Sequence, residues 1–150
     1  MTTEKEREVI QNQTYNIINK AAGGNQAAAD YLWMLSRITR TMDDVYDQDQ
    51  KISREDYLEV FEYLLVRMPT NPFFNHNRSL LLSQHLSMYN AWMAANRRES
   101  GDETDKIYAH VWRDTIHEVI PIVALLTQGY SAMEQVSELI RITFKKKLGE

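Results

Sequence analysis

The chain has 150 residues, 43% apolar and 25% charged, and its formal net charge is −4, a globular composition without the basic excess that nucleic-acid binding favours. It contains no cysteine, which excludes disulfides and thiolate zinc sites. The longest apolar run, VIPIVALL, is shorter than the ~20 residues that cross a bilayer, and the N-terminus is polar, so we expect a cytoplasmic protein without membrane contact.

Glycine and proline are scarce, and they separate six stretches with helical patterns. The predicted helices span approximately residues 3–21, 25–47, 53–68, 77–99, 102–128 and 131 to the KKKL tail. Capping residues support three of the starts. Asn25 precedes the second helix, Ser53 and Asp56 form a capping box before the third, and Ser131 and Glu134 form one before the sixth.

Proline interrupts the chain at two further places. Pro121 is expected to bend or break the fifth helix, because its ring removes a backbone donor and crowds the preceding turn. The stretch MPTNPFF, bracketed by Pro69 and Pro72, is predicted to be a loop.

Apolar residues recur with helical spacing, and no segment alternates with the period of a strand. The stripe of the second helix consists of Tyr31, Leu35, Ile38, Met42 and Val45. The stripe of the fourth consists of Leu82, Leu86, Tyr89 and Met93. We therefore predict an all-α fold, a single-domain bundle of about six helices over residues 1–150. Residues 1–22 have few apolar positions and are predicted to be a loosely attached N-terminal helix or a partner-binding one.

Acidic residues gather at the end of the second helix, where TMDDVYDQDQ contains Asp43, Asp44 and Asp47. Eight acidic and two basic residues lie between positions 43 and 62. A helix dipole disfavours negative charge at this end, so a cation would relieve the crowding. Oxygen ligands at this spacing suit Mg²⁺ or Mn²⁺ held with waters and a substrate phosphate. The same residues also fit a solvated helix face, with Arg40 pairing to Asp43 or Asp44.

The fifth predicted helix places His110, Asp114 and His117 on one side. Two imidazoles and a carboxylate on one face form a ligand set for a transition metal. A polar outer face or a hydrogen-bonded seam between helices explains the same pattern. His85 lies on the apolar stripe of the fourth helix and is predicted to be a core residue.

Two resemblances extend these patterns. The motif DDVYD resembles the first aspartate-rich motif, DDxxD, of isoprenoid diphosphate synthases, which are all-α proteins. This resemblance implies that Asp43, Asp44 and Asp47 hold Mg²⁺ ions that bind a diphosphate.

The second resemblance covers residues 30–130. The order of the acidic helix end, Asn71-Pro72-Phe73, Trp92 with Ala95-Asn96 and Glu99, then Arg113 and Gly129 is similar to a group of small helical proteins encoded in tailed-bacteriophage genomes. It implies a phage or prophage origin, and therefore a location in the infected host cell or in the virion.

Two main hypotheses of function follow. In the first, Asp43, Asp44 and Asp47 form a divalent-cation site that His110, Asp114 and His117 face, and the protein acts on a phosphate- or diphosphate-containing small molecule. In the second, the protein is a non-enzymatic phage interaction or virion-associated protein whose acidic surface at 43–62 binds a host or phage protein. A homo-oligomer that pairs acidic with basic ends is a third.

Overall fold

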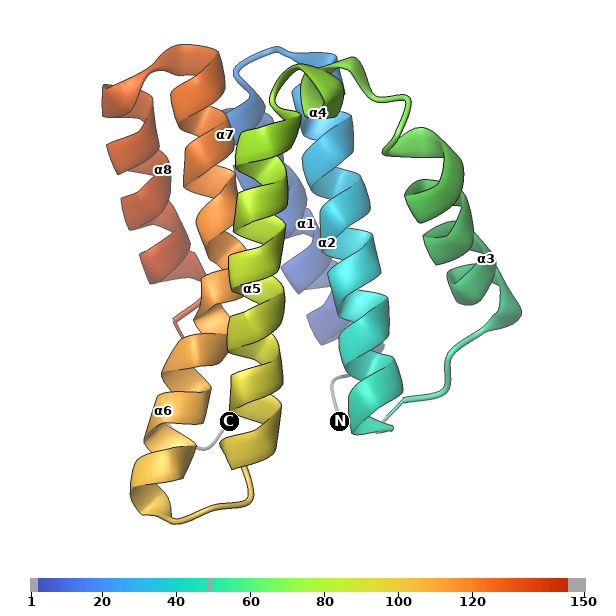
Figure 1. Ribbon diagram of the computed structural model, residues 1–150, viewed down its shortest axis with the longest axis vertical. Helices are drawn as coiled ribbons and strands as arrows, with labels where there is room; N and C mark the ends of the chain where they lie inside the picture. The colour runs from blue at the N-terminus through green and yellow to red at the C-terminus, as the bar shows by residue number, and fades with distance from the viewer. Residues whose placement is uncertain (1–2, 49, 146–150) are drawn as a thin grey trace. The chain divides into compact units, whose positions relative to one another are not determined.

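The computed structural model describes residues 3–48 and 50–145, and these residues form helices and no strand (Figure 1). The all-α prediction is therefore confirmed. The chain divides into two compact units, Met1–Asn77 and Arg78–Glu150. Within the described part of the chain, no helix is both long and apolar enough to span a bilayer.

Unit 1 is built on two long antiparallel helices and three short segments. Its elements are α1 (Glu4–Ala22), α2 (Gln26–Asp47), α3 (Arg54–Glu62), the π-helical turn η1 (Tyr63–Arg67) and α4 (Pro72–His76). The C-terminal half of α1 packs on α2 and buries Ile17 and Ile18, whereas its N-terminal half is mostly exposed. The predicted caps of α2 and α3 are confirmed, because Asn25 accepts from Ala28 N–H and Ser53 forms a capping box with Asp56.

The core of unit 1 surrounds α2, which packs against both α1 and α4. Tyr31 is fully buried, and its ring packs against Phe73 and Phe74 at centroid distances of 5.9 Å each. Burial raises the pKa of Tyr31 far above its ordinary value. The prediction of a plain loop at MPTNPFF is wrong, since Asn71 caps a short helix with Pro72 at its first position. The Asn71 amide also donates to the carbonyl of Ala27 at 2.9 Å, which ties α4 to the start of α2.

Unit 2 consists of two helical hairpins. Its elements are α5 (Arg78–Arg98), α6 (Glu103–Arg113), the 3₁₀ turn η2 (Asp114–Glu118), α7 (Val119–Gln128) and α8 (Tyr130–Thr143). α5 packs along α6 and η2, and α7 packs along α8. The buried apolar positions of α5 are Leu81, Met88 and Ala95 rather than the predicted stripe, of which Leu82, Leu86 and Tyr89 are exposed. That prediction is wrong because α5 is apolar on two faces and the sequence does not say which one is covered.

Two predicted features of unit 2 also differ. The irregular turn lies at 114–118, before Pro121. Pro121 is the third residue of α7, where a backbone N–H would have no acceptor within the helix, so its missing N–H breaks no hydrogen bond. The capping box of Ser131 and Glu134 does not form. Gly129, at φ 97°, lets the chain turn directly into α8, and its carbonyl accepts from Met133 N–H at 3.2 Å. The helix therefore begins at Tyr130, and Ser131 lies inside it.

Candidate functional site

The α3–η1 segment carries its large apolar side chains on the solvent side. We call these residues the outer face of α3–η1: Tyr57, Leu58, Phe61, Leu64, Leu65 and Val66. Each is more than half exposed, and Phe61 reaches 65% and Leu65 62%. In Figure 1 the segment lies beside α2, which is the helix it packs against. A contiguous apolar surface of this kind in a folded protein marks an interaction site more often than chance exposure.

The side of α3 that faces α2 is ionic. Arg37 of α2 donates to Glu59 at 2.8 Å and to Asp56 at 3.4 Å. The side chains of Arg37, Asp56 and Glu59 are 28%, 36% and 33% exposed, so these charges are less exposed than the phenylalanine of the same helix. Val60 is the buried apolar residue of α3. The helix α3 therefore turns two carboxylates toward α2 and exposes large apolar residues, which is the reverse of the usual arrangement of an amphipathic helix.

The π-helical turn extends this arrangement. Met68 N–H donates to the carbonyl of Tyr63 at 2.9 Å, which closes a turn one residue wider than an α-turn. The wider turn changes the direction in which the side chains after it point around the helix axis. Met68, which follows it, is buried, whereas Leu65 and Val66 within it are exposed. Tyr63 is half-buried, and burial and then the negative charge of Glu59 raise its pKa.

The aspartates singled out from the sequence lie in the last turn of α2. Asp43 and Asp44 are half-buried and Asp47 is exposed. Arg40 approaches Asp44 to 3.9 Å, the partner expected for a solvated helix face. Among the described residues, no group of three or more histidine, aspartate or glutamate side chains is placed to hold a metal ion. A cation bound at this helix end stays a prediction.

The histidine-bearing segment belongs to unit 2 and is split by the turn η2. His110 is a half-buried residue of α6, whereas Asp114 and His117 belong to η2. Because side chains three apart eclipse in a 3₁₀ turn, Asp114 and His117 lie on one side of η2, and Thr115 and Glu118 on another. Both pairs line a hollow of about 360 Å³, and His110 does not. Of the three residues predicted to act together, Asp114 and His117 therefore line the same hollow, and His110 does not.

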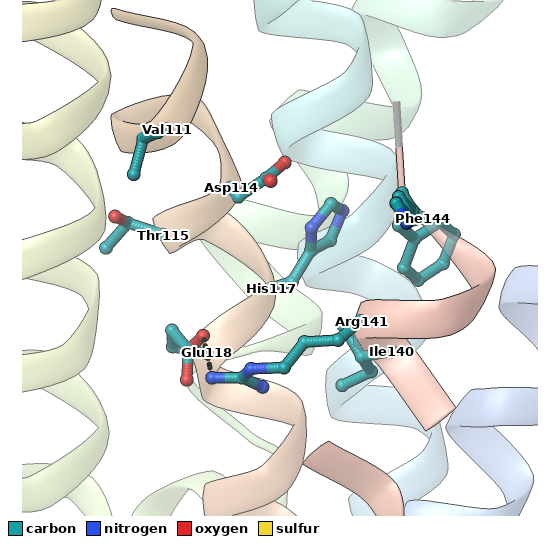
Figure 2. A pocket seen from close by; sticks show the side chains of 9 residues that line it. Val111, Asp114, Thr115, His117, Glu118, Ile140, Arg141 and Phe144 are labelled. Carbon is teal, nitrogen blue, oxygen red and sulfur yellow. Dashed lines mark hydrogen bonds and ion pairs between the residues drawn. The ribbon is translucent and has the colours of Figure 1, made fainter. Parts of the chain in front are cut away.

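Figure 2 shows this hollow between η2 and the end of α8. The imidazole of His117 stacks on the ring of Phe144 at 4.5 Å between centroids. Glu118 and Arg141 are joined by an ion pair of 3.1 Å, drawn as a dashed line. These two contacts connect the turn to α8 across the hollow. The formal charges of the lining balance, because Asp114 and Glu118 are opposed by Arg141 and Lys145.

Three residues of the phage-type resemblance also come together in unit 2. Arg113 of α6 donates to the Asn96 side-chain oxygen at 3.0 Å and pairs with Glu99. Asn96 is buried, and its side-chain nitrogen is without a hydrogen-bond partner among the described residues. The cluster connects α5 to α6 and so acts in packing.

Comparison of the chain with protein-family models, curated proteins and solved structures found no match. The function must therefore be argued from the residues themselves. Sequence reasoning did not select the outer face of α3–η1. The signal was present as the spacing of Tyr57, Leu58, Phe61, Leu64 and Leu65, but a stripe at helical spacing is ordinarily the buried side of a helix.

Proposed function

We propose that this protein is a non-enzymatic interaction protein that binds a basic amphipathic segment of another protein on the outer face of α3–η1. The observation that carries the proposal is the inverted polarity of α3: Asp56 and Glu59 turn toward Arg37, while Phe61 and its neighbours turn outward. Burying a side chain such as Leu or Phe contributes about 1.5–3 kcal/mol, so leaving several exposed is costly unless a partner covers them.

The negative charge near the outer face of α3–η1 favours a positively charged partner. The segment from 43 to 62 carries eight acidic and two basic residues, and Glu55 lies beside the outer face, whereas Glu62 is ion-paired with Arg67 at 2.9 Å. A segment that presents apolar residues among lysines or arginines would gain both burial and electrostatic attraction. Anionic lipid would be repelled by the same carboxylates, which favours a protein over a membrane surface. If the phage-type resemblance holds, the partner is a host or phage protein.

The proposal can be tested with a synthetic probe. A fluorescein-labelled peptide of about 18 residues, with leucines at positions i, i+3, i+4 and i+7 and lysines elsewhere, is titrated with the full chain, and anisotropy is recorded. A matched peptide has glutamates in place of the lysines. We expect the basic peptide to bind and the acidic one to bind at least about 10-fold more weakly.

Two variants locate the binding surface. Phe61→Ser is expected to weaken binding of the basic peptide by at least about 10-fold, because it removes the centre of the outer face. Val9→Ser on α1 is the matched control, since Val9 is also half exposed but lies elsewhere. Equal binding of the two peptides, equal effects of the two variants, or preferential binding to anionic vesicles would each overturn the proposal.

A further inference from the structure

The hollow between η2 and the end of α8 has no part in the proposed binding on α3–η1. It measures about 360 Å³, and all the segments that form it belong to unit 2 (Figure 2). A volume of this size lies within the range of pockets that hold small molecules. Its apolar wall consists of Val111, Ile140 and Phe144. The rest of the lining carries both signs of charge, so the hollow suits a ligand that is itself partly apolar and partly charged.

Two of the four charged groups in the lining offset each other. Glu118 and Arg141 form an ion pair of 3.1 Å, and Arg141 also donates to the side chain and carbonyl of Ser137. Asp114 and Lys145 differ from this pair. Both are exposed, and the side chain of neither has a hydrogen bond or an ion pair among the described residues. The hollow therefore offers a ligand one carboxylate and one ammonium group.

These two groups favour a ligand that carries both charges. An anion would be attracted by Lys145 and repelled by Asp114, and an organic cation would meet the reverse. A small zwitterion would place its ammonium at Asp114 and its carboxylate at Lys145, and such charge-assisted contacts are stronger than neutral hydrogen bonds. An apolar side chain on the same molecule would be buried against Ile140 and Phe144. We propose that the hollow binds a free amino acid with an apolar side chain, such as leucine.

Chemical-shift titration of the isotope-labelled full chain tests this proposal. The probes are leucine, isocaproate, which is leucine without its ammonium, and isoamylamine, which is leucine without its carboxylate. We expect leucine to shift the amide signals of residues 111–118 and 140–145, which contain the lining of the hollow. Leucine should also bind at least about 5-fold more tightly than either analogue, because each analogue loses one charged contact.

Two variants assign the two charges. Asp114→Asn should weaken leucine binding by at least about 5-fold without weakening isocaproate binding, because isocaproate has no ammonium. Lys145→Gln should likewise weaken leucine binding without weakening isoamylamine binding. Glu138→Gln is the matched control, since Glu138 is exposed on α8 and does not line the hollow. All three residues are exposed, so none of these changes should alter the thermal transition followed by circular dichroism.

Three outcomes would overturn it. The first is a wild-type chain in which leucine, up to about 20 mM, leaves the amide signals of these residues unshifted. The second is isocaproate or isoamylamine binding as tightly as leucine, which would make the hollow a site for an anion or for a cation. The third is a leucine affinity that Asp114→Asn and Lys145→Gln change no more than Glu138→Gln does. The peptide-binding experiment has a separate readout, so each proposal can fail alone.

Discussion

The helices α3 and α8 each pack on one longer or more buried helix of their own unit, but they do so with opposite sides. α8 buries Val136 and Ile140 and pairs its Arg141 with Glu118 at the surface. α3 instead directs Asp56 and Glu59 toward Arg37 and exposes Phe61. The first arrangement is the ordinary one for an amphipathic helix. In the second arrangement, the side chain whose burial would stabilise the fold most, Phe61, remains exposed.

The difference has an energetic meaning. Partly exposed ion pairs stabilise a fold by about 0.2–1 kcal/mol each, well below the contribution of a buried leucine or phenylalanine. A helix held in this way is attached weakly and keeps its apolar side accessible. That combination is what the proposed docking surface on α3–η1 requires.

Truncating one apolar residue on each helix should separate the two arrangements most clearly. Ile140→Ala on α8 is expected to lower the free energy of unfolding by about 2–5 kcal/mol, because Ile140 is buried. Phe61→Ala on α3 should change it by less than ~0.5 kcal/mol, despite the larger side chain. Urea denaturation measures both, and a loss at Phe61 comparable to that at Ile140 would mean that the outer face is covered within the folded chain.

Removing Arg37 should loosen α3 without unfolding the unit. Arg37→Gln is expected to cost about 1 kcal/mol and to speed amide hydrogen exchange in residues 54–67. Added salt, from about 0.05 to about 0.5 M, should speed the same exchange in the wild-type chain. If Arg37→Gln speeds hydrogen exchange in α8 (130–143) as much as in α3, the claim that Arg37 holds α3 specifically is wrong.

Acid should weaken unit 2 through His85 of α5. Burial lowers the pKa of His85 below its ordinary value of 6.5, so the unfolded chain binds a proton more readily than the folded one. This histidine costs no stability above about pH 6.5, and stability falls as the pH drops below that value toward the lower folded pKa. His85→Gln should flatten this part of the pH dependence. An unchanged slope in the variant would place the acid sensitivity elsewhere.

The smallest expected effect concerns divalent cations at the end of α2. The cation-site hypothesis predicts that Mg²⁺ or Mn²⁺ raises the melting temperature of the wild-type chain, which thermal denaturation with and without the ion measures. Asp43→Asn and Asp47→Asn serve as controls. A melting temperature that rises with Mg²⁺ in the wild type and not in these variants would support the cation-site hypothesis, and an unchanged wild type would contradict it.

The parts of the fold that depend on neighbouring residues could be predicted from the sequence. Asn25 and Ser53 cap helices because their side chains reach backbone groups three positions on. Ser131 has the same local pattern but does not cap, because Gly129, at positive φ, starts the helix two residues earlier than a Ser131 cap would. The predicted α5 stripe fails for a different reason. Leu81 and Leu82 point about 100° apart around the helix, and the sequence does not reveal which of the two directions is covered.

The candidate site depends on distant residues and was therefore harder to predict. Arg37 donates to Glu59, which lies 22 positions further along the chain, and this contact directs the acidic side of α3 toward α2. The sequence alone showed both the acidic residues and the apolar stripe, but not which of them faces α2. Likewise, the 3₁₀ turn that aligns Asp114 with His117 precedes Pro121 and has no motif of its own.

The most direct test of the account is the labelling rate of a cysteine at position 61. The chain contains no cysteine, so Phe61→Cys provides a single thiol, and Val60→Cys provides the buried reference one position away. The account predicts that the thiol at 61 reacts with a maleimide much faster than the thiol at 60, and that the basic amphipathic peptide slows the reaction at 61. Equally slow labelling at both positions without peptide, or no protection at 61 by saturating peptide, would contradict it.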